Sequence, residues 1–202
     1  MTHRPTPAEL DRLVQAIHPL DRPDRDLPVG GYPDKHLTED VDRAAVLVPI
    51  LQGSEAAILL TVRNRGLTKH AGQVALPGGR RDPGENFPQQ TALREASEEV
   101  GIPIDRVQTL GFLDRVNTIS RFRITPVVGL VDADVDPSPC PDEVSHLFRL
   151  PLDWALDLDR YRQHEIIRAG RRFTVMSVAA GQWPIWGATA TILHQLARAA
   201  NA

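Results

Sequence analysis

The chain has 202 residues, a length that suits one domain with a short extension better than two small independent domains. Its net charge of −3 argues against a nucleic-acid or membrane partner, so we expect a small-molecule substrate. No apolar run approaches the roughly 18 residues that cross a membrane, and the single Cys140 suits a reducing compartment. We therefore expect a cytoplasmic protein. The sequence is compatible with a homo-oligomer but does not specify one.

Residues 1–40 are rich in Pro and Asp and predict an N-terminal extension rather than a domain. They contain one short helix, at about residues 7–17, followed by extended chain through Gly30 and Gly31. The predicted domain spans the remaining residues, 41–202.

Two apolar runs rich in β-branched residues open this domain. Residues 44–51 and 56–62 predict paired strands that are joined through Gly53 and Ser54. Because proline cannot donate a backbone hydrogen bond, Pro49 predicts that the first strand lies near an edge or a bulge.

Basic side chains come next and precede a loop that contains Gly78 and Gly79. They are Arg63, Arg65, Lys69 and His70. Such a cluster can hold the oxygens of a polyphosphate, whereas Arg65 and Lys69 taken singly are explained as well by solvated turn residues. The glycines allow a backbone carbonyl to approach a ligand closely, so the loop offers one further oxygen ligand.

A helix is predicted at about residues 87–100. Asn86 can cap its N-terminus, Pro88 fits its first turn, and Gly101 suits the position just past its C-terminus. An apolar stripe at helical spacing should face the core. It consists of Leu93, Ala96 and Val100.

Three carboxylates, Glu95, Glu98 and Glu99, share another side of this helix. Like charges at this spacing repel by about 0.2–0.5 kcal/mol per pair, and the C-terminal half of a helix disfavours anions. A solvated acidic face is the ordinary explanation, but only Arg94 stands beside these glutamates and no lysine follows at i+4. A hard divalent cation with oxygen ligands, Mg²⁺ or Mn²⁺, would remove the repulsion, and the Gly78 carbonyl is a further candidate ligand.

The C-terminal half of the chain predicts further strands and two helices. The strands are residues 108–115, 123–131, 165–168 and 173–178, and the helices are residues 151–160 and 188–199. We expect Trp186 in the core, with a place beside the substrate as the alternative. Strands interspersed with helices, without a regular βαβ rhythm, predict an α/β fold with a mixed sheet between helices.

The glycine loop and the helix together resemble the Nudix box. That pattern is Gly, five residues, Glu, seven residues, Arg-Glu, an apolar residue, any residue, Glu-Glu, any residue, Gly and an apolar residue. The chain matches it from Gly79 through Glu85 to Arg94 and on to Ile102, except that eight residues rather than seven separate Glu85 from Arg94. The resemblance implies a Nudix-type α/β/α sandwich and metal-dependent hydrolysis of a diphosphate bond.

Residues 59–79 also resemble the segment that precedes the box in the coenzyme A diphosphatase branch of that family, roughly LLTxRxxxLxxHxGQVxxPGG. Residues 142–152 and 185–190 look like the same branch. This resemblance implies that the substrate is coenzyme A or a thioester of it, cleaved to 3′,5′-ADP and 4′-phosphopantetheine or its acyl derivative. The alternatives are a diphosphatase acting on ADP-ribose or a nucleoside triphosphate, and a catalytically silent domain that senses nucleotides.

The two resemblances imply a role for each candidate residue. The metal ligands would be Glu95, Glu98, Glu99 and Gly78, with Glu95 and Glu99 the firmest. Arg94 would orient Glu85 or another carboxylate of the box. The general base would be a helix glutamate, Glu95 or Glu98, or else Glu143, for which the start of a helix is the alternative explanation. The substrate contacts would be Arg63, Lys69, His70, Gly72 and Gln73.

Overall fold

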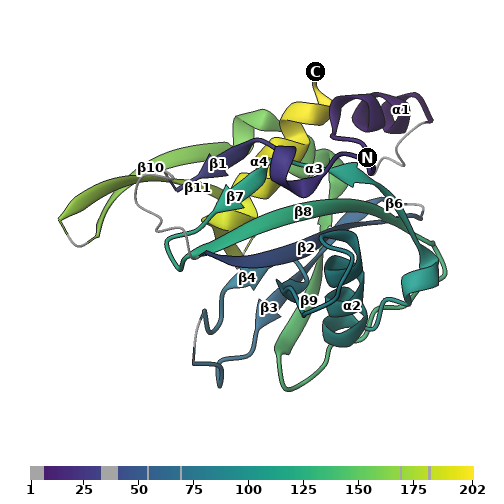
Figure 1. Ribbon diagram of the computed structural model, residues 1–202, viewed down its shortest axis with the longest axis horizontal. Helices are drawn as coiled ribbons and strands as arrows, with labels where there is room; N and C mark the ends of the chain where they lie inside the picture. The colour runs from purple at the N-terminus through teal and green to yellow at the C-terminus, as the bar shows by residue number, and fades with distance from the viewer. Residues whose placement is uncertain (1–6, 33–40, 54, 69, 169, 182) are drawn as a thin grey trace.

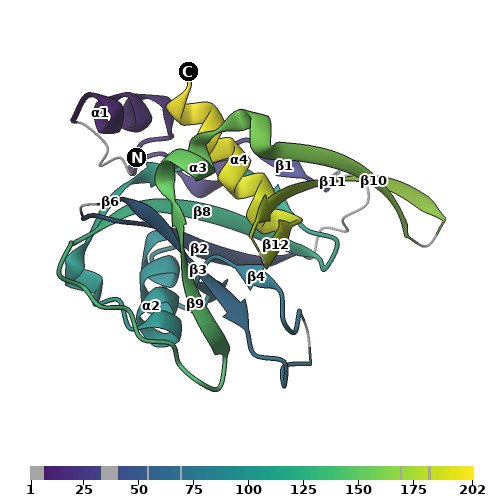
Figure 2. The same cartoon turned by 180° about the vertical axis from the view of Figure 1, so that it is seen from behind.

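A mixed β-sheet with helices on both faces forms the body of the molecule (Figure 1). The computed structural model describes residues 7–32, 41–53, 55–68, 70–168, 170–181 and 183–202. Helix α2 (Gln89–Val100) covers one face of the sheet. The opposite face carries α1 (Pro7–Ala16), α3 (Leu152–Leu156) and α4 (Ala188–Ala200), which Figure 2 shows from behind. The predicted α/β/α arrangement with a mixed sheet is therefore confirmed.

The main sheet is built around two long parallel neighbours, β2 and β8. Its continuous order is β1 (Val29–Gly31), β7 (Arg115–Asn117), β8 (Phe122–Val131), β2 (Asp42–Leu51), β3 (Ala57–Arg63) and β4 (Val74–Ala75). Off this path lie β5 (Gly78–Arg80) on β2, β6 (Val107–Phe112) on β8, and β9 (Val144–Pro151) on β3. Besides β2 and β8, only the short β1 and β7 pair in parallel among the described strands.

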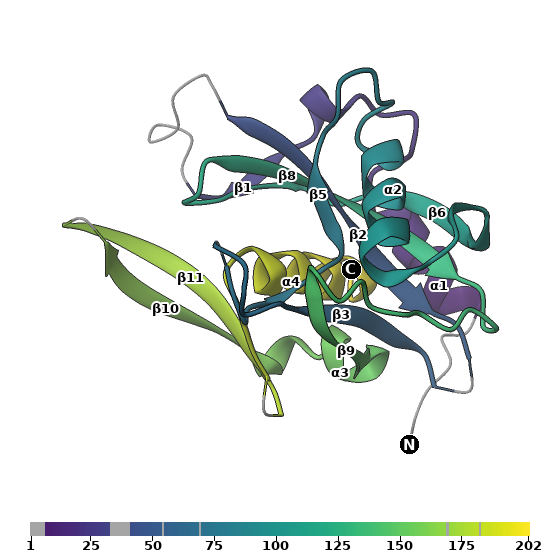
Figure 3. The same cartoon turned by 90° about the horizontal axis from the view of Figure 1, so that it is seen from below.

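Strand β2 is central, and the sheet forks along it (Figure 3). On the side away from β8, residues 44–46 pair with β5 and residues 50–51 pair with β3. The prediction that Pro49 marks an edge strand or a bulge is wrong. Pro49 lies between the two paired stretches, where a missing N–H is tolerated. Because β3 leaves β2 at this point, β4 and β5 stand on the two arms of the fork.

A second, smaller antiparallel sheet contains β10 (Tyr161–Arg168), β11 (Arg171–Ala180) and β12 (Trp183–Trp186). Figure 1 shows the β10–β11 hairpin projecting from the body. Its root is held where β11 and β12 pack against α4. The two strands predicted here are confirmed but are longer than expected, whereas β12 was not predicted.

Other boundaries also differ from the predictions. The strand expected at residues 108–115 is two strands, β6 and β7, which pair with opposite ends of β8. The helix expected at residues 151–160 stops after α3, because the Asp157 carboxylate accepts the N–H of Asp159 and starts a separate 3₁₀ turn. Strand β9 was missed because polar Ser145, His146 and Arg149 interrupt its apolar pattern.

The N-terminal segment packs onto the domain. Leu13 and Ile17, on and just after α1, are buried in the core that includes α4. Downstream, Asp24 accepts hydrogen bonds from Thr125 at 2.5 Å and from Arg43 at 2.6 Å. The predicted division at residue 40 remains an interpretation of the sequence. None of the helices in the described ranges is long and apolar enough to span a membrane.

Candidate active site

Helix α2 is fixed against the sheet by its apolar stripe. Leu93, Ala96 and Val100 are buried in the core on this face, as predicted. Gly101 ends the helix as expected, with φ 67°. The predicted cap is wrong, because the helix begins at Gln89 and the Asn86 side chain caps nothing. The backbone N–H of Asn86 instead donates to the Gln90 side chain at 2.8 Å.

Glu95 and Glu99, one helical turn apart, reach the two glycines of β5. The N–H of Gly78 donates to Oε2 of Glu99 at 3.0 Å. A Cβ atom on Gly79 would lie 2.4 Å from the Glu95 carboxylate, so only glycine fits there without moving that group. Burial raises the pKa of Glu99 to about 7, although Gly78 and Arg63 act in the opposite direction. Burial also raises the pKa of Glu95, against the opposing charge of Arg94.

Arg94 contacts three carboxylates of the box, those of Glu85, Glu95 and Glu98. Its Nε donates to Glu85 at 2.7 Å, its Nη1 to Glu98 at 2.8 Å, and its Nη2 lies 3.0 Å from Glu95. The Glu98 side chain is 59% exposed, so its carboxylate is held at the surface by this contact. The arginine therefore contacts each of the three glutamates through a different nitrogen, and its positive charge lies between their carboxylates.

Glu85 is a buried anchor for this arrangement. Burial by itself would raise its pKa, but hydrogen bonds outweigh burial and lower the pKa to about 2. The donors are Arg94, the Thr91 hydroxyl at 2.5 Å and the Asp82 N–H at 2.8 Å. The extra residue between Glu85 and Arg94 is thus accommodated without loss of their contact. Thr91 was missed by the sequence reasoning, although it lies within the box at a helical position.

Arg63 and Glu143 approach Glu99 from the opposite arm of the fork. Nη1 of Arg63 lies 3.6 Å from Oε1 of Glu99, and the charge of Glu143 raises the pKa of both Glu95 and Glu99. Glu143 does not begin a helix, since β9 follows it directly. Nε of Arg63 is buried, and no atom in the described part of the chain accepts its proton.

Asn64 holds the turn that carries Glu143. Its backbone N–H donates to the Glu143 carbonyl at 2.8 Å, and its side-chain amide donates to the Pro141 carbonyl at 2.7 Å. Nearby, the Cys140 N–H donates to the Glu99 carbonyl at 2.8 Å and thereby ties the same turn to α2. The sequence reasoning missed Asn64; its only signal was an asparagine placed just after a predicted strand.

The other predicted substrate contacts lie on the loop between β3 and β4. Nδ1 of His70 and Oε1 of Gln73 are 2.9 Å apart, and both residues line a cavity together with Arg63. Gly72 lies on the same loop, and its N–H donates to the Arg63 carbonyl at 3.1 Å. Lys69 lies outside the described residues.

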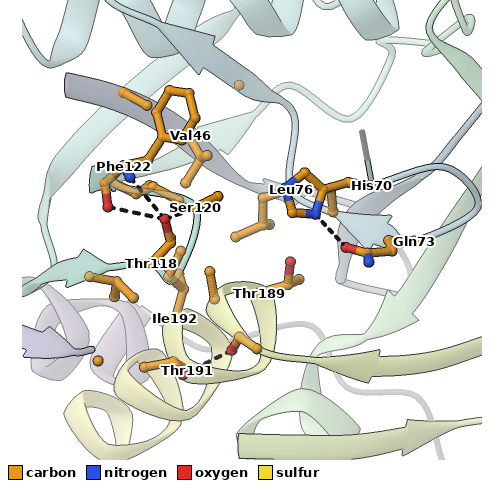
Figure 4. A pocket seen from close by; sticks show the side chains of 18 of the residues that line it. Val46, His70, Gln73, Leu76, Thr118, Ser120, Phe122, Thr189, Thr191 and Ile192 are labelled. Carbon is orange, nitrogen blue, oxygen red and sulfur yellow. Dashed lines mark hydrogen bonds between the residues drawn. The ribbon is translucent and has the colours of Figure 1, made fainter. Parts of the chain in front are cut away.

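The cavity has a volume of about 1110 Å³ and joins the glutamates to the far side of the sheet. Figure 4 shows the His70–Gln73 contact on one side, the β7–β8 turn with Thr118 and Ser120 on the other, and α4 beneath them. The prediction that Trp186 belongs to the core is wrong, because this residue is 46% exposed and lines the cavity. The β7–β8 turn carries no motif, so it was not predicted, whereas the start of α4 belongs to residues 185–190, which look like the coenzyme A branch.

The donor chemistry of Glu95 and Glu99 fits a hard divalent cation. Their carboxylates lie against neighbouring residues of β5 and border the cavity. Burial raises the pKa of both groups, and the charge of Glu95 adds to the increase for Glu99. No group of three or more His, Cys, Asp or Glu residues in the described ranges is placed to hold a metal ion. The Glu98 carboxylate accepts a hydrogen bond from Arg94 at 2.8 Å.

Comparison with known proteins agrees with the glutamate helix. The profile of the NUDIX domain matches residues 41–183. A Pectobacterium atrosepticum protein named "Uncharacterized Nudix hydrolase NudL" is 48% identical over 155 residues, which are 77% of this chain and 81% of that protein. A Photorhabdus laumondii protein of the same name is 43% identical over 166 residues, covering 82% and 89%.

Among solved structures, a MutT Nudix hydrolase from Burkholderia pseudomallei is 23% identical and has a TM-score of 0.48, with 78% of this chain and 98% of that chain covered. The sequence relatives and the matched profile carry the assignment, since both extend over most of the chain and include the whole of α2 and β5. The chain belongs to the Nudix hydrolase family, whose members hydrolyse phosphoric anhydride bonds.

Proposed function

We propose that the chain hydrolyses the diphosphate bond of coenzyme A or of its thioesters, giving 3′,5′-ADP and 4′-phosphopantetheine or its acyl derivative. One observation carries this proposal. Arg63, His70 and Gln73 belong to the segment that resembles the coenzyme A branch, and they line the same cavity as Glu95 and Glu99. The segment and the box therefore border one cavity, which would hold the substrate.

The metal site would be formed by Glu95, Glu99 and the Gly78 carbonyl, with Glu98 joining if its carboxylate leaves Arg94. When bound, Mg²⁺ or Mn²⁺ neutralises charge on phosphoryl oxygens and lowers the pKa of an attacking water. Arg94 is a positioning residue, because it holds Glu95 against β5. These roles agree with the preference of both ions for carboxylate and carbonyl oxygen.

Arg63 is the proposed phosphate contact. Its Nε is a buried donor that no atom of the described chain accepts, and such donors are rare because an unmade hydrogen bond costs about 1–3 kcal/mol. A phosphoryl oxygen of the substrate would accept this hydrogen bond. His70 and Gln73 would contact the substrate beyond the phosphates.

Glu143 is the proposed general base, with Glu98 as the alternative. It lines the cavity, and Asn64 fixes its backbone beside Arg63. In the proposed step the water oxygen bonds to one phosphorus, the bridging P–O bond breaks, and the water proton passes to the Glu143 carboxylate. The bridging oxygen leaves with the other phosphate. No covalent intermediate with the protein is required.

Product identification tests the proposal directly. The protein would be incubated with Mg²⁺ and coenzyme A, ADP-ribose or nucleoside triphosphates, and the products would be identified by mass spectrometry in ¹⁸O-labelled water. We expect 3′,5′-ADP and 4′-phosphopantetheine, with the label showing which phosphorus is attacked. Faster turnover of ADP-ribose would overturn the substrate assignment.

A matched pair of variants tests the site. Glu99→Gln should lower kcat by at least about 100-fold while the far-ultraviolet circular dichroism stays unchanged. Glu55→Gln, at an exposed position away from the cavity, should retain full activity. An active Glu99→Gln variant would refute the proposed role of Glu99, and no turnover of any compound would favour a silent nucleotide sensor. The cytoplasmic location belongs to the same proposal, supported by the single, unpaired Cys140.

A further inference from the structure

The cavity changes character along its length. Its end at α2 carries the glutamates and Arg63, whereas its other end lies between the sheet and α4 and is lined by aliphatic side chains. These come from five elements and the segment after β4. They are Val46, Leu76, Val116, Ile124, Met176 and Ile192. We call this the apolar end.

The polar residues of α4 do not change this character. The Thr189 hydroxyl donates to the Val74 carbonyl at 3.2 Å, and the Thr191 hydroxyl donates to the Gly187 carbonyl at 2.9 Å. Both hydroxyl groups therefore donate their hydrogen bonds to backbone carbonyls. Figure 4 shows both threonines on α4 below the cavity, with Ile192 beside them and Leu76 across from them.

The size of the cavity also exceeds what the reacting diphosphate needs. Its volume of about 1110 Å³ is above the roughly 300–1,000 Å³ of ordinary small-molecule pockets. A base, ribose or phosphate placed against these aliphatic side chains would lose its hydrogen bonds to water. The polar residues at the β7–β8 turn that also line the cavity, Asn117, Thr118 and Ser120, already bond within the protein. A hydrocarbon chain would lose no such hydrogen bonds. The occupant that matches this lining is an apolar chain.

We infer that the apolar end holds the acyl chain of a coenzyme A thioester, so that acylated coenzyme A is hydrolysed in preference to the free thiol. This inference rests on the proposed function, because the chain is attached to the substrate whose diphosphate lies at the glutamates. Half-buried Ile124 and Met176 would contact the chain along its sides, while buried Val46 and Ile192 form the floor.

The burial of each methylene predicts the size of the preference. Burying one CH₂ group of a ligand changes its binding constant or its specificity constant, kcat/KM, by about fourfold. We therefore expect kcat/KM to rise by about two- to fourfold per methylene, and by at least about tenfold from coenzyme A to hexanoyl-coenzyme A, before it levels off when the apolar end is full.

The experiment measures kcat/KM for coenzyme A and for its acetyl, butyryl, hexanoyl and octanoyl thioesters with Mg²⁺. Two variants then change the apolar end in different ways. Met176→Gln keeps the length of the side chain but makes it polar, and Ala188→Phe fills space at the start of α4. Both should lower the ratio of octanoyl-coenzyme A to coenzyme A turnover by about fivefold or more. Ala179→Phe is the matched control, because Ala179 is exposed on β11 and does not line the cavity.

The outcomes separate this inference from the proposed function. Equal kcat/KM for all thioesters and for coenzyme A would overturn the inference and leave the proposed function intact. Equal slowing of free and acylated coenzyme A by Met176→Gln would also overturn it, because the apolar end would then hold a part common to both. No hydrolysis of any coenzyme A compound would refute the proposed function itself. A graded preference that both variants reduce, and the control retains, supports the inference.

Discussion

The contact between Glu85 and Arg94 makes a prediction about stability that can be worked from the structure. Glu85 is 8% exposed, and its hydrogen bonds lower its pKa from the ordinary 4.5 to about 2. Each unit between the folded and unfolded values is worth about 1.4 kcal/mol, so ionised Glu85 contributes about 3 kcal/mol at neutral pH. Glu85→Gln removes this charge with little change of shape. The free energy of unfolding should therefore fall by about 3 kcal/mol at pH 7.

The contribution of Glu85 to the free energy of unfolding should also depend on pH in one direction. Because the pKa is lowered in the folded chain, the contribution is complete above about pH 4.5 and is lost as the pH falls toward 2. Urea unfolding of the wild type and Glu85→Gln at pH 7, 5, 4 and 3.5 should show two free energies that converge below pH 4.5. Glu98→Gln removes the exposed partner of the same arginine and should cost less than about 1 kcal/mol.

A difference of the same size at pH 7 and pH 3.5 would refute the reasoning, since it would mean that the charge of Glu85 is not the cause. Equal losses from Glu85→Gln and Glu98→Gln at pH 7 would refute it as well. In that case burial would not distinguish the two partners of Arg94.

Two further predictions concern space and burial. Gly78→Ala would place a Cβ atom 2.4 Å from a backbone oxygen of β2 and should destabilise the protein by about 1–3 kcal/mol. Gly79→Ala would instead push the Glu95 side chain away from β5, so it should lower kcat with a smaller loss of stability than Gly78→Ala. Calorimetry and kinetics on both variants separate these effects, and identical behaviour would contradict them. Tyr161→Phe leaves the buried Ala155 carbonyl without its 2.5 Å hydrogen bond and should cost about 1–2 kcal/mol in urea unfolding, with kcat unchanged; a loss below about 0.5 kcal/mol would be contrary to this account.

The sequence predicted best those elements whose signal is local. Helix α2 was placed because its apolar stripe, its terminal glycine and its glutamates all follow one 3.6-residue period. The strands at residues 44–51 and 56–62 were found because each is an unbroken apolar run, as expected for strands buried on both faces. Their order in the sheet was not predictable, and Pro49 was misread because its tolerance depends on where β5 ends and β3 begins.

The residues that line the apolar end of the cavity were the hardest part of the site to predict from the sequence. Residues Ile124, Met176 and Ile192 are ordinary aliphatic residues of three separate elements, and only the tertiary fold brings them to one space. Strand β12 was missed for a similar reason, since its four residues contain two exposed or half-exposed tryptophans and a proline. Residues in contact through long sequence separations leave no periodic pattern in any one segment.

The two arginines beside the glutamates differ in how their hydrogen-bond donors are used. Arg94 directs its guanidinium to three carboxylates and to the Arg80 carbonyl at 3.2 Å, so its hydrogen-bonding capacity is used within the protein. Arg63 lies on the cavity side, is 3.6 Å from Glu99, and keeps a buried Nε without an acceptor in the described chain. A buried donor left over in this way is costly unless a ligand accepts from it. Phosphate oxygens are suitable acceptors, so we propose that Arg63 joins the acidic helix to an anionic substrate.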